Sequence, residues 1–286
     1  MRLLLFAAAV ALAVVQAAPA PRAGQPAARQ AKSHALIVVG LPGDTEHDKL
    51  FESTARQWRR WLTRDLGFSQ ADVRVLFGRK GKSGLASGPA TRAAIERHVA
   101  NLKQAMHRDD RLWVFFLGHG DYDGEHASFQ LPGPDLRDDH LAKLFAGVRC
   151  REQVFWMTTS ASGWFLRGLS ARGRIVITAT AADEEYNETE FPHALAEVSR
   201  LSPDRLDANK DGKVSVLELY RYTVAEVGRR FAADRRIPTE HAQLDDNGDG
   251  VGTEQPVADG GAGQKSTADG RLAARTFLAW KARTSR

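Results

Sequence analysis

The chain has 286 residues, of which 43% are hydrophobic and 26% are charged, and its formal net charge is +5. These values are typical of a globular protein with one large domain, or one domain and an appendage. A single cysteine, Cys150, excludes an intramolecular disulfide, and we expect it to be a buried structural thiol. The basic residues are spread along the chain, which argues against nucleic-acid binding.

The N-terminus has the pattern of a secretory signal peptide. Arg2 is followed by an apolar run at residues 3–15 and by small residues up to Ala20. The run is too short to span a bilayer comfortably, so we predict a cleaved signal peptide over residues 1–20. The mature protein is then expected to be exported, periplasmic or secreted, with no membrane anchor after cleavage. Residues 21–33 are rich in Ala, Pro, Gln and Arg and are predicted to be a disordered lead-in.

Strands and helices alternate through residues 34–200, which predicts an α/β domain with a mainly parallel sheet and right-handed crossovers. The expected strands are 35–39, 72–77, 112–117, 154–159 and 174–180. The expected helices are 48–66, 91–106, 137–146, 164–169 and 191–200. A short hairpin is expected near residues 128–131.

Two of these strands end in residues that can do chemistry. Residues 112–117 (LWVFFL) are wholly apolar and are followed by Gly-His-Gly, which contains His119 and Gly120. Residues 154–159 form a second buried strand, and Ser160 follows it directly. The carboxyl ends of parallel strands are where open α/β sheets hold ligands and catalytic groups. If the two strands are neighbours, about 5 Å apart, His119 and Ser160 face one cleft.

These segments resemble the caspase-like cysteine peptidases, and most closely the legumain family with its bacterial relatives. The family has a strand ending in His-Gly, matched by His119-Gly120, and a second ending in a Glu-Ala-Cys-x-Ser-Gly type turn, on which residues 159–163 fall. The segment at 177–191 is similar to the family's next strand and loop. The resemblance covers roughly residues 35–200 and implies a caspase-like three-layer fold. It also implies that the backbone N–H groups of Gly120 and Ser160 are oxyanion donors.

The departure from the family concerns the nucleophile, because Ser160 occupies the position of the catalytic cysteine. An alcohol is a far weaker acid than a thiol and needs a base in direct hydrogen-bond contact. The residues therefore favour a catalytically impaired pseudo-peptidase that keeps its cleft for a peptide or protein ligand. A working peptidase using Ser160 and His119, and a calcium-dependent interaction module with a vestigial cleft, remain as alternatives. The loop after the first strand lacks the Arg-His pair with which legumain reads Asn, so no substrate preference is transferred.

Residues 207–218 match the EF-hand calcium loop at every ligand position. Oxygen-bearing side chains occupy positions 1, 3, 5, 9 and 12, a glycine occupies position 6, and position 7 contributes its backbone carbonyl. The predicted Ca²⁺ ligands are Asp207, Asn209, Asp211, Lys213, Ser215 and Glu218. We expect residues 191–200 to form the entering helix and 216–232 the exiting one, within an EF-hand-like segment over 201–235.

A second acidic stretch, residues 245–250 (DDNGDG), repeats the first half of this pattern, but Pro256 occupies the closing position. We therefore expect a turn or a partial site there rather than an independent complete site. Residues 236–286 are predicted to contain this acidic loop, a Gly-rich linker and a last helix at 272–282.

Overall fold

The computed structural model describes residues 29–258 and 268–280. By its contacts the chain divides into two units, Met1–Gln30 and Ala31–Arg286, and the strands and helices of the described residues all belong to the second. The expected signal peptide lies outside the described residues, as do most of the lead-in and part of the Gly-rich linker. No helix among the described residues is long and apolar enough to cross a membrane.

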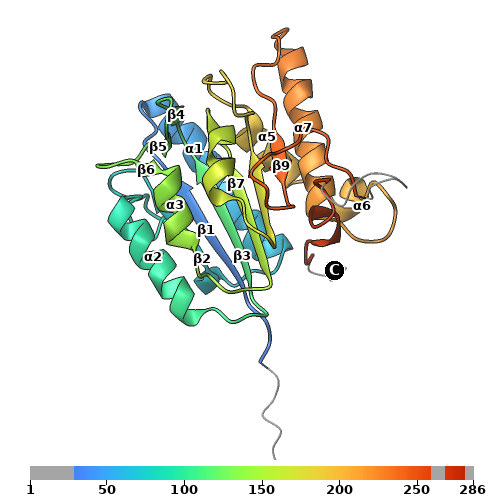
Figure 1. Cartoon of the computed structure of the whole chain (residues 1–286), viewed down its shortest axis with the longest axis horizontal. Coiled ribbons are helices and arrows are strands. Elements are labelled where there is room, and N and C mark those ends of the chain that lie inside the picture. Colours follow the sequence, from blue (N-terminus) through green and yellow to red (C-terminus); the bar gives the residue numbers. More distant parts are fainter. Residues whose placement is uncertain (1–28, 259–267, 281–286) are drawn as a thin grey trace, which may run out of the picture. The chain divides into compact units, whose positions relative to one another are not determined.

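The second unit is built around a six-stranded sheet in the order β2-β1-β3-β7-β8-β9 (Figure 1). The strands are β1 (Ser33–Val39), β2 (Val73–Phe77), β3 (Arg111–Leu117), β7 (Glu152–Met157), β8 (Arg174–Thr178) and β9 (Gln243–Asp245). Every pairing is parallel except that of β8 with β9. The central strands are buried on both faces, as their uninterrupted apolar sequences require. The prediction of a mixed α/β fold with a mainly parallel sheet is confirmed.

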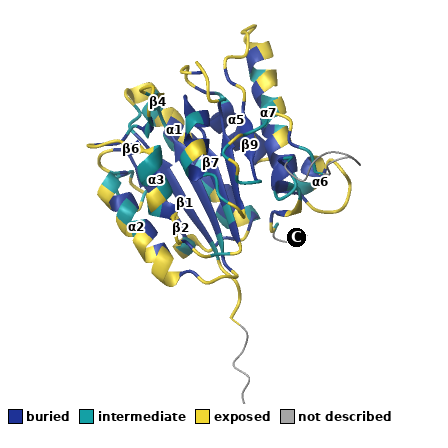
Figure 2. Ribbon diagram, in the orientation of Figure 1, coloured by how far each residue is buried: buried dark blue, intermediate teal, exposed yellow. Residues whose placement is uncertain are grey.

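Helices cover both faces of this sheet and make three layers. The helices are α1 (Thr45–Arg60), α2 (Arg92–Ala105), α3 (Asp138–Phe145), α4 (Leu166–Leu169), α5 (Phe191–Val198), α6 (Pro203–Leu206) and α7 (Val216–Ala233). One hydrophobic cluster joins α1, α5 and α7 to the sheet, and the other joins α2 and α3 to its opposite face. Figure 1 shows α2 and α3 on the near side, and Figure 2 shows buried residues concentrated in the strands and on the inner sides of the helices.

Helix α1 illustrates how the sequence specifies these layers. Asp44 caps its N-terminus by accepting hydrogen bonds from the N–H groups of Glu46 and His47. Trp58 is fully buried against the sheet, with its ring 5.2 Å from that of Phe115. The helix continues as one π-helical turn, η1 (Trp61–Asp65).

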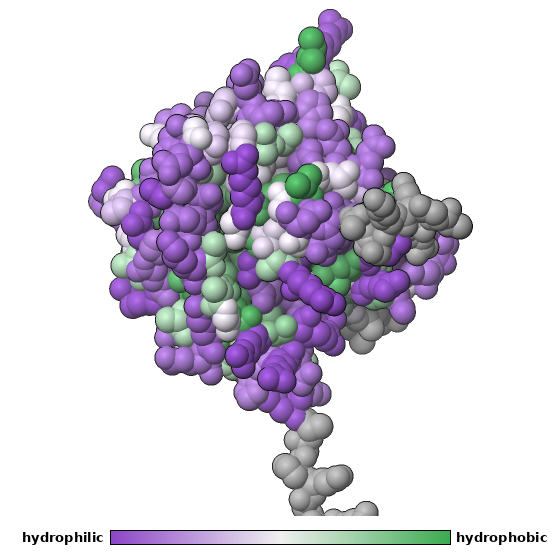
Figure 3. Space-filling view, viewed as in Figure 1, coloured by the Kyte–Doolittle hydropathy of each residue, from purple (hydrophilic) through white to green (hydrophobic). Residues whose placement is uncertain are grey.

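Hydrophilic side chains predominate on the face of the molecule shown in Figure 3.

A small antiparallel sheet follows β3 and includes the expected hairpin. It consists of β4 (Gly120–Tyr122), β5 (Ala127–Phe129) and β6 (Leu136–Arg137). The ring of Phe129 packs edge-on against Phe116 at 5.2 Å. The small sheet is thereby fixed to the end of β3, directly after His119.

The C-terminal region differs from the prediction in two respects. Strand β9 belongs to residues 236–286, which the sequence placed outside the α/β domain, yet it pairs with β8 as the last strand of the main sheet. The prediction of a helix at 272–282 is also wrong for the part of this range that the structure describes. Only a single 3₁₀ turn forms there, Ala273–Arg275. Tertiary pairing outweighs the local helix preference there, because Leu278 donates to the carbonyl of Val214, and Val216 donates to that of Thr276.

Candidate functional site

The ends of β3 and β7 bring two of the predicted site residues together. The Ser160 hydroxyl donates to the carbonyl oxygen of Gly120 at 2.8 Å, and the Gly120 N–H donates to Ser160 Oγ at 3.3 Å. A side chain on Gly120 would not fit, because its Cβ would lie 2.5 Å from the carbonyl oxygen of Ser160. The strands are therefore neighbours, as expected, and the Gly120 N–H predicted as an oxyanion donor is engaged by the hydroxyl of Ser160.

His119 lies beside this position but contacts a different loop. Its Nε2 lies 3.3 Å from the carbonyl oxygen of Pro42, and its ring centroid is 5.6 Å from those of His47 and Phe51. No hydrogen bond joins the side chains of His119 and Ser160, both of which lie in the described part of the chain. Ser160 accordingly has main-chain partners and no base in contact.

His47 is a neighbour of His119 that was not predicted from the sequence. Its two ring nitrogens contact Glu188 at 2.9 Å and Asp44 at 2.7 Å, and these bonds, led by that to Glu188, raise the pKa of His47. The Asp-x-x-His spacing at the start of α1 was the available signal for Asp44 and His47. Nothing in the sequence links Glu188 to His47, because the two residues are 141 positions apart. A histidine whose protonated form is favoured by two carboxylates thus lies next to His119.

Ser162 and Gly163 shape the turn that follows Ser160. The Ser162 hydroxyl accepts hydrogen bonds from the N–H groups of Ala179 and Thr180, which fixes the end of β8. A Cβ on Gly163 would lie 2.2 Å from the carbonyl carbon of Ala181. The Ser-Gly part of this motif therefore has a clear structural role.

Glu185 ties the loops at this edge of the sheet to one another. Its carboxylate accepts hydrogen bonds from the N–H groups of Ala181 and His241 and contacts the His241 ring. Its carbonyl oxygen accepts from the N–H of Ala161 at 2.9 Å. The bond to Glu185 raises the pKa of His241. Neither residue was predicted, because their contact joins positions 56 residues apart.

Cys150 is remote from this site in the topology, because it precedes β7 whereas Ser160 follows it. The thiol donates to the carbonyl oxygen of Glu152 at 3.2 Å, and burial raises its pKa to about 11. A thiol with this pKa is a poor nucleophile at neutral pH. Cys150 does not replace Ser160 at the end of the strand.

The loop at 207–218 has its acidic side chains turned inward. Asp207 accepts hydrogen bonds from the N–H groups of Asp211 and Gly212, and Gly212 has the left-handed φ of +81° that the sharp turn needs. Glu218 reaches back across the loop, where its Oε1 accepts from the N–H groups of Ala208 and Asn209 at 2.9 and 3.3 Å. The oxygen donors are the type that Ca²⁺ prefers, and the inward Glu218 fits the closing position.

The helices beside this loop correct one expectation. The exiting helix α7 begins with a capping box, in which Ser215 accepts from the N–H of Glu218 while the Glu218 carboxylate accepts from the N–H of Ser215. The helix expected at 191–200 is present as α5, which ends at Val198. Its expected role as the entering helix is wrong, because the one-turn helix α6 lies between it and Asp207. Ser202 and Pro203 start this new turn, as an N-cap and N1 pair favours.

The second acidic loop folds like the first and is closed by a residue from elsewhere in the chain. Asp245, which is buried, accepts from the N–H groups of Gly248 and Gly250. Asp269 Oδ1 accepts from the N–H groups of Asp246 and Asn247 at 3.1 and 3.3 Å, the loop positions that Glu218 holds in the first loop. Burial, followed by the charges of Asp245 and Asp246, raises the pKa of Asp269 to about 7. Pro256 occupies the closing position of this loop and has no carboxylate, and Asp269 from the C-terminal segment provides one instead.

Asp246 anchors that segment, and Asp246→Ala is expected to release it. Its two carboxylate oxygens accept from the N–H groups of Gly270 and Ala273 at 2.9 and 2.7 Å in a buried setting. Loss of both bonds should lower the free energy of unfolding by about 3 kcal/mol and expose residues 268–280 to protease. Limited proteolysis and urea unfolding measure the two effects. Asp249→Ala, an exposed change in the same loop, is the control, and equal behaviour of the two variants would contradict the prediction.

A third acidic group lies on the small sheet and α3. Ligand atoms of His126, Asp138 and Asp139 lie within 4.8 Å of one another. Asp139, however, already contacts Lys143 at 3.0 Å and Arg137 at 3.1 Å, and the bond to Lys143 leads the causes that lower its pKa to about 2. We interpret the group as a surface ion-pair cluster.

Comparisons with known proteins add no family assignment. No family model matches the chain, and no curated protein does. A solved structure of protein GSU0716 from Geobacter sulfurreducens is similar at 15% sequence identity with a TM-score of 0.43, covering 75% of this chain and 92% of that one.

Proposed function

We propose that the protein is an exported, legumain-related caspase-like peptidase homologue that binds a peptide or protein with little or no turnover. The supporting observation is the pairing of Ser160 with Gly120 at the adjoining ends of β3 and β7, with His119 next to Gly120. This is the placement that the resemblance to the family requires. The site would hold its ligand at the carboxyl edge of the sheet.

The contacts of Ser160 favour binding over catalysis. A serine nucleophile needs a base that accepts its proton, and a third group that orients the base. Here the hydroxyl proton is directed to the carbonyl oxygen of Gly120, and His119 Nε2 is directed to that of Pro42. A turnover step would have to break the first of these bonds and bring the imidazole to Ser160.

Calcium is the second part of the proposal, with Asp207, Asn209, Asp211, Ser215 and Glu218 as side-chain ligands and Lys213 contributing its carbonyl. The ammonium group of Lys213 is engaged elsewhere, since it lies 4.9 Å from the centroid of the Phe277 ring. The ion would supply fixed positive charge among these carboxylates and tie α6 to α7. We assign it a structural role, separate from the Ser160 position.

Replacement of Ser160 tests the assignment of the site. Ser160→Ala should leave peptide affinity within about threefold of wild type, because the proposed ligand contacts are main chain. Ser160→Cys should gain peptidase activity at least tenfold above wild type, since a thiolate is an intrinsically better nucleophile. Both are measured in calcium with a peptide panel that varies the residue before the scissile bond.

Two controls make this test specific. Alkylation by iodoacetamide should be fast in Ser160→Cys and slow in wild type, where Cys150 is the one thiol. Adding His119→Ala to Ser160→Cys should remove the gained activity. Wild-type turnover that Ser160→Ala abolishes would establish a working serine peptidase instead. Calcium-dependent protein binding without any peptide binding would support the interaction module.

A further inference from the structure

A pocket of about 260 Å³ lies between α5, α7 and the segments that flank β9, separate from the contacts of Ser160 and His119. Its walls include the apolar side chains of Phe191, Val224 and Val227. Glu240 and the exposed Glu254 also line it. An apolar pocket with a few convergent polar groups is the usual form of a small-ligand site.

Glu240 is the unusual member of this lining, because it is a carboxylate that is only 5% exposed. Both of its oxygens accept from the N–H of Glu190, at 2.9 and 3.1 Å, at the start of α5. Among the described residues, no Lys, Arg or His forms an ion pair with it. A buried carboxylate without a cation is costly, because hydrogen bonds replace only part of its hydration.

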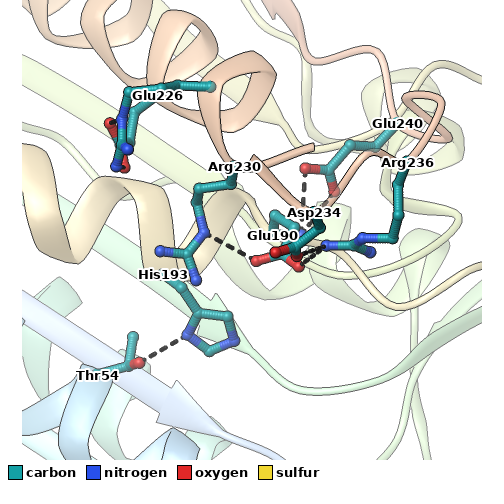
Figure 4. A network of polar contacts seen from close by, with 9 residues as sticks. Thr54, Glu190, His193, Glu226, Arg230, Asp234, Arg236 and Glu240 are labelled. Carbon is teal, nitrogen blue, oxygen red and sulfur yellow. Dashed lines mark hydrogen bonds and ion pairs between the residues drawn. The ribbon is translucent and has the colours of Figure 1, made fainter. Parts of the chain in front are cut away.

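The nearby guanidinium groups are already engaged by another carboxylate. Arg230 Nε contacts Glu190 at 2.9 Å, and Arg236 contacts the second oxygen of the same group (Figure 4). Figure 4 also shows that Glu240 is directed at the backbone of Glu190, whereas Arg230 and Arg236 reach its side chain. Burial, together with the charges of Glu190 and Glu185, raises the pKa of Glu240 to about 8. Without a cation beside it, Glu240 therefore retains its proton at neutral pH, and a bound cation would favour its ionised form. His241, which also lines the pocket, is paired with Glu185.

We propose that this pocket binds a primary ammonium or guanidinium group carried on an apolar stem. The cationic head would pair with Glu240, and the stem would lie against Phe191, Val224 and Val227. The match is one of charge and of polarity, because Glu240 in its ionised form would be a buried carboxylate without an ion-pair partner among the described residues, beside apolar walls. Such a group is found on Lys and Arg side chains of peptides and on free alkylamines. The proposal stands apart from the Ser160 site and does not depend on it.

Helix α7 offers a substitution at the lining of the pocket. Gly228 lines it and is exposed, and a Cβ built there meets no atom within 4 Å. Gly228→Leu should therefore be accommodated without a clash, narrow the pocket at its exposed side and favour the helix. Ala225→Leu is the matched control, because Ala225 is exposed on the same helix and does not line the pocket. Glu240→Gln removes the charge and keeps an acceptor for the N–H of Glu190.

The experiment is an NMR titration of the purified protein at pH 8.5, with pentylammonium and pentanol as probes. Wild type and Ala225→Leu should bind pentylammonium at least tenfold more tightly than pentanol, as expected for a charge-assisted bond. Glu240→Gln should reduce this ratio to about one, and Gly228→Leu should weaken binding of both probes. Equal affinity for the two probes in wild type would overturn the proposal. So would pentylammonium binding as tight in Glu240→Gln as in wild type.

Titration with Nα-acetyl-lysine amide, and with its norleucine analogue as the uncharged control, shows whether the cationic group comes from a peptide side chain or from a free alkylamine. Tighter binding of the lysine amide than of pentylammonium, with loss in Glu240→Gln, supports a peptide side chain as the ligand. Binding of pentylammonium alone supports a free alkylamine.

Discussion

Calcium is expected to raise the melting temperature of the wild-type protein by about 5 to 10 °C, and Glu218→Gln is expected to remove that gain. An ion present at 100 times its Kd stabilises the folded state by about 2.7 kcal/mol. For a chain of this size, each kcal/mol of stabilisation raises the melting temperature by about 2 to 4 °C. Glu218 is decisive because its carboxylate spans the loop from Ser215 to Ala208. The amide in Glu218→Gln keeps one acceptor and loses the charge.

Melting is measured with excess calcium and with excess EDTA, in wild type, Glu218→Gln and Glu226→Gln. Glu226 lies on the same helix, outside the loop, and pairs with Arg229, so Glu226→Gln should keep the full calcium effect. In EDTA, Glu218→Gln should also melt somewhat below wild type, because it loses hydrogen bonds to the loop backbone. A calcium gain of wild-type size in Glu218→Gln would show that the ion is not held by the loop at 207–218.

The sheet was predictable because its signals are local. The apolar run ending at Leu117 and the one ending at Met157 are buried on both faces. Gly118 follows the first run directly, and Ser160 follows the second after two threonines. Such runs specify central parallel strands without reference to the rest of the chain. The neighbouring positions of Gly120 and Ser160 followed from the same reasoning.

The contacts that the sequence did not predict all join distant segments. Asp269 closes a loop that begins 24 residues earlier, and Glu188 reaches His47 across 141 residues. Strand β9 has only three residues, which is too short for a periodic signal, and its partner β8 fixes it. Local propensity and spacing contain no information on such pairings. Glu240 is a similar case, because an isolated Glu in an otherwise polar stretch gives no sign of burial.

The burial of Glu240 gives the second large expected effect, a stability that falls as the pH rises. The pKa of this group is about 8 in the folded protein against an ordinary value of 4.5. The folded state therefore retains a proton that the unfolded state releases, and the free energy of unfolding should fall between about pH 4.5 and pH 8. The shift corresponds to at most roughly 5 kcal/mol.

The test compares urea unfolding of wild type, Glu240→Gln and Glu254→Gln from pH 5 to pH 9 in constant calcium. Half-buried His98 and buried His193, whose pKa values burial lowers to about 4, destabilise the protein as the pH falls below 6.5. Their effect is common to all three proteins, so the difference in unfolding free energy between wild type and Glu240→Gln isolates the contribution of the Glu240 carboxyl.

Wild type should lose several kcal/mol relative to Glu240→Gln between pH 5 and pH 8, with no further change above that. Glu254→Gln should follow wild type, because Glu254 is exposed. Parallel curves for wild type and Glu240→Gln would mean that Glu240 is ionised at neutral pH in the folded protein, which requires a cation or water that reaches it.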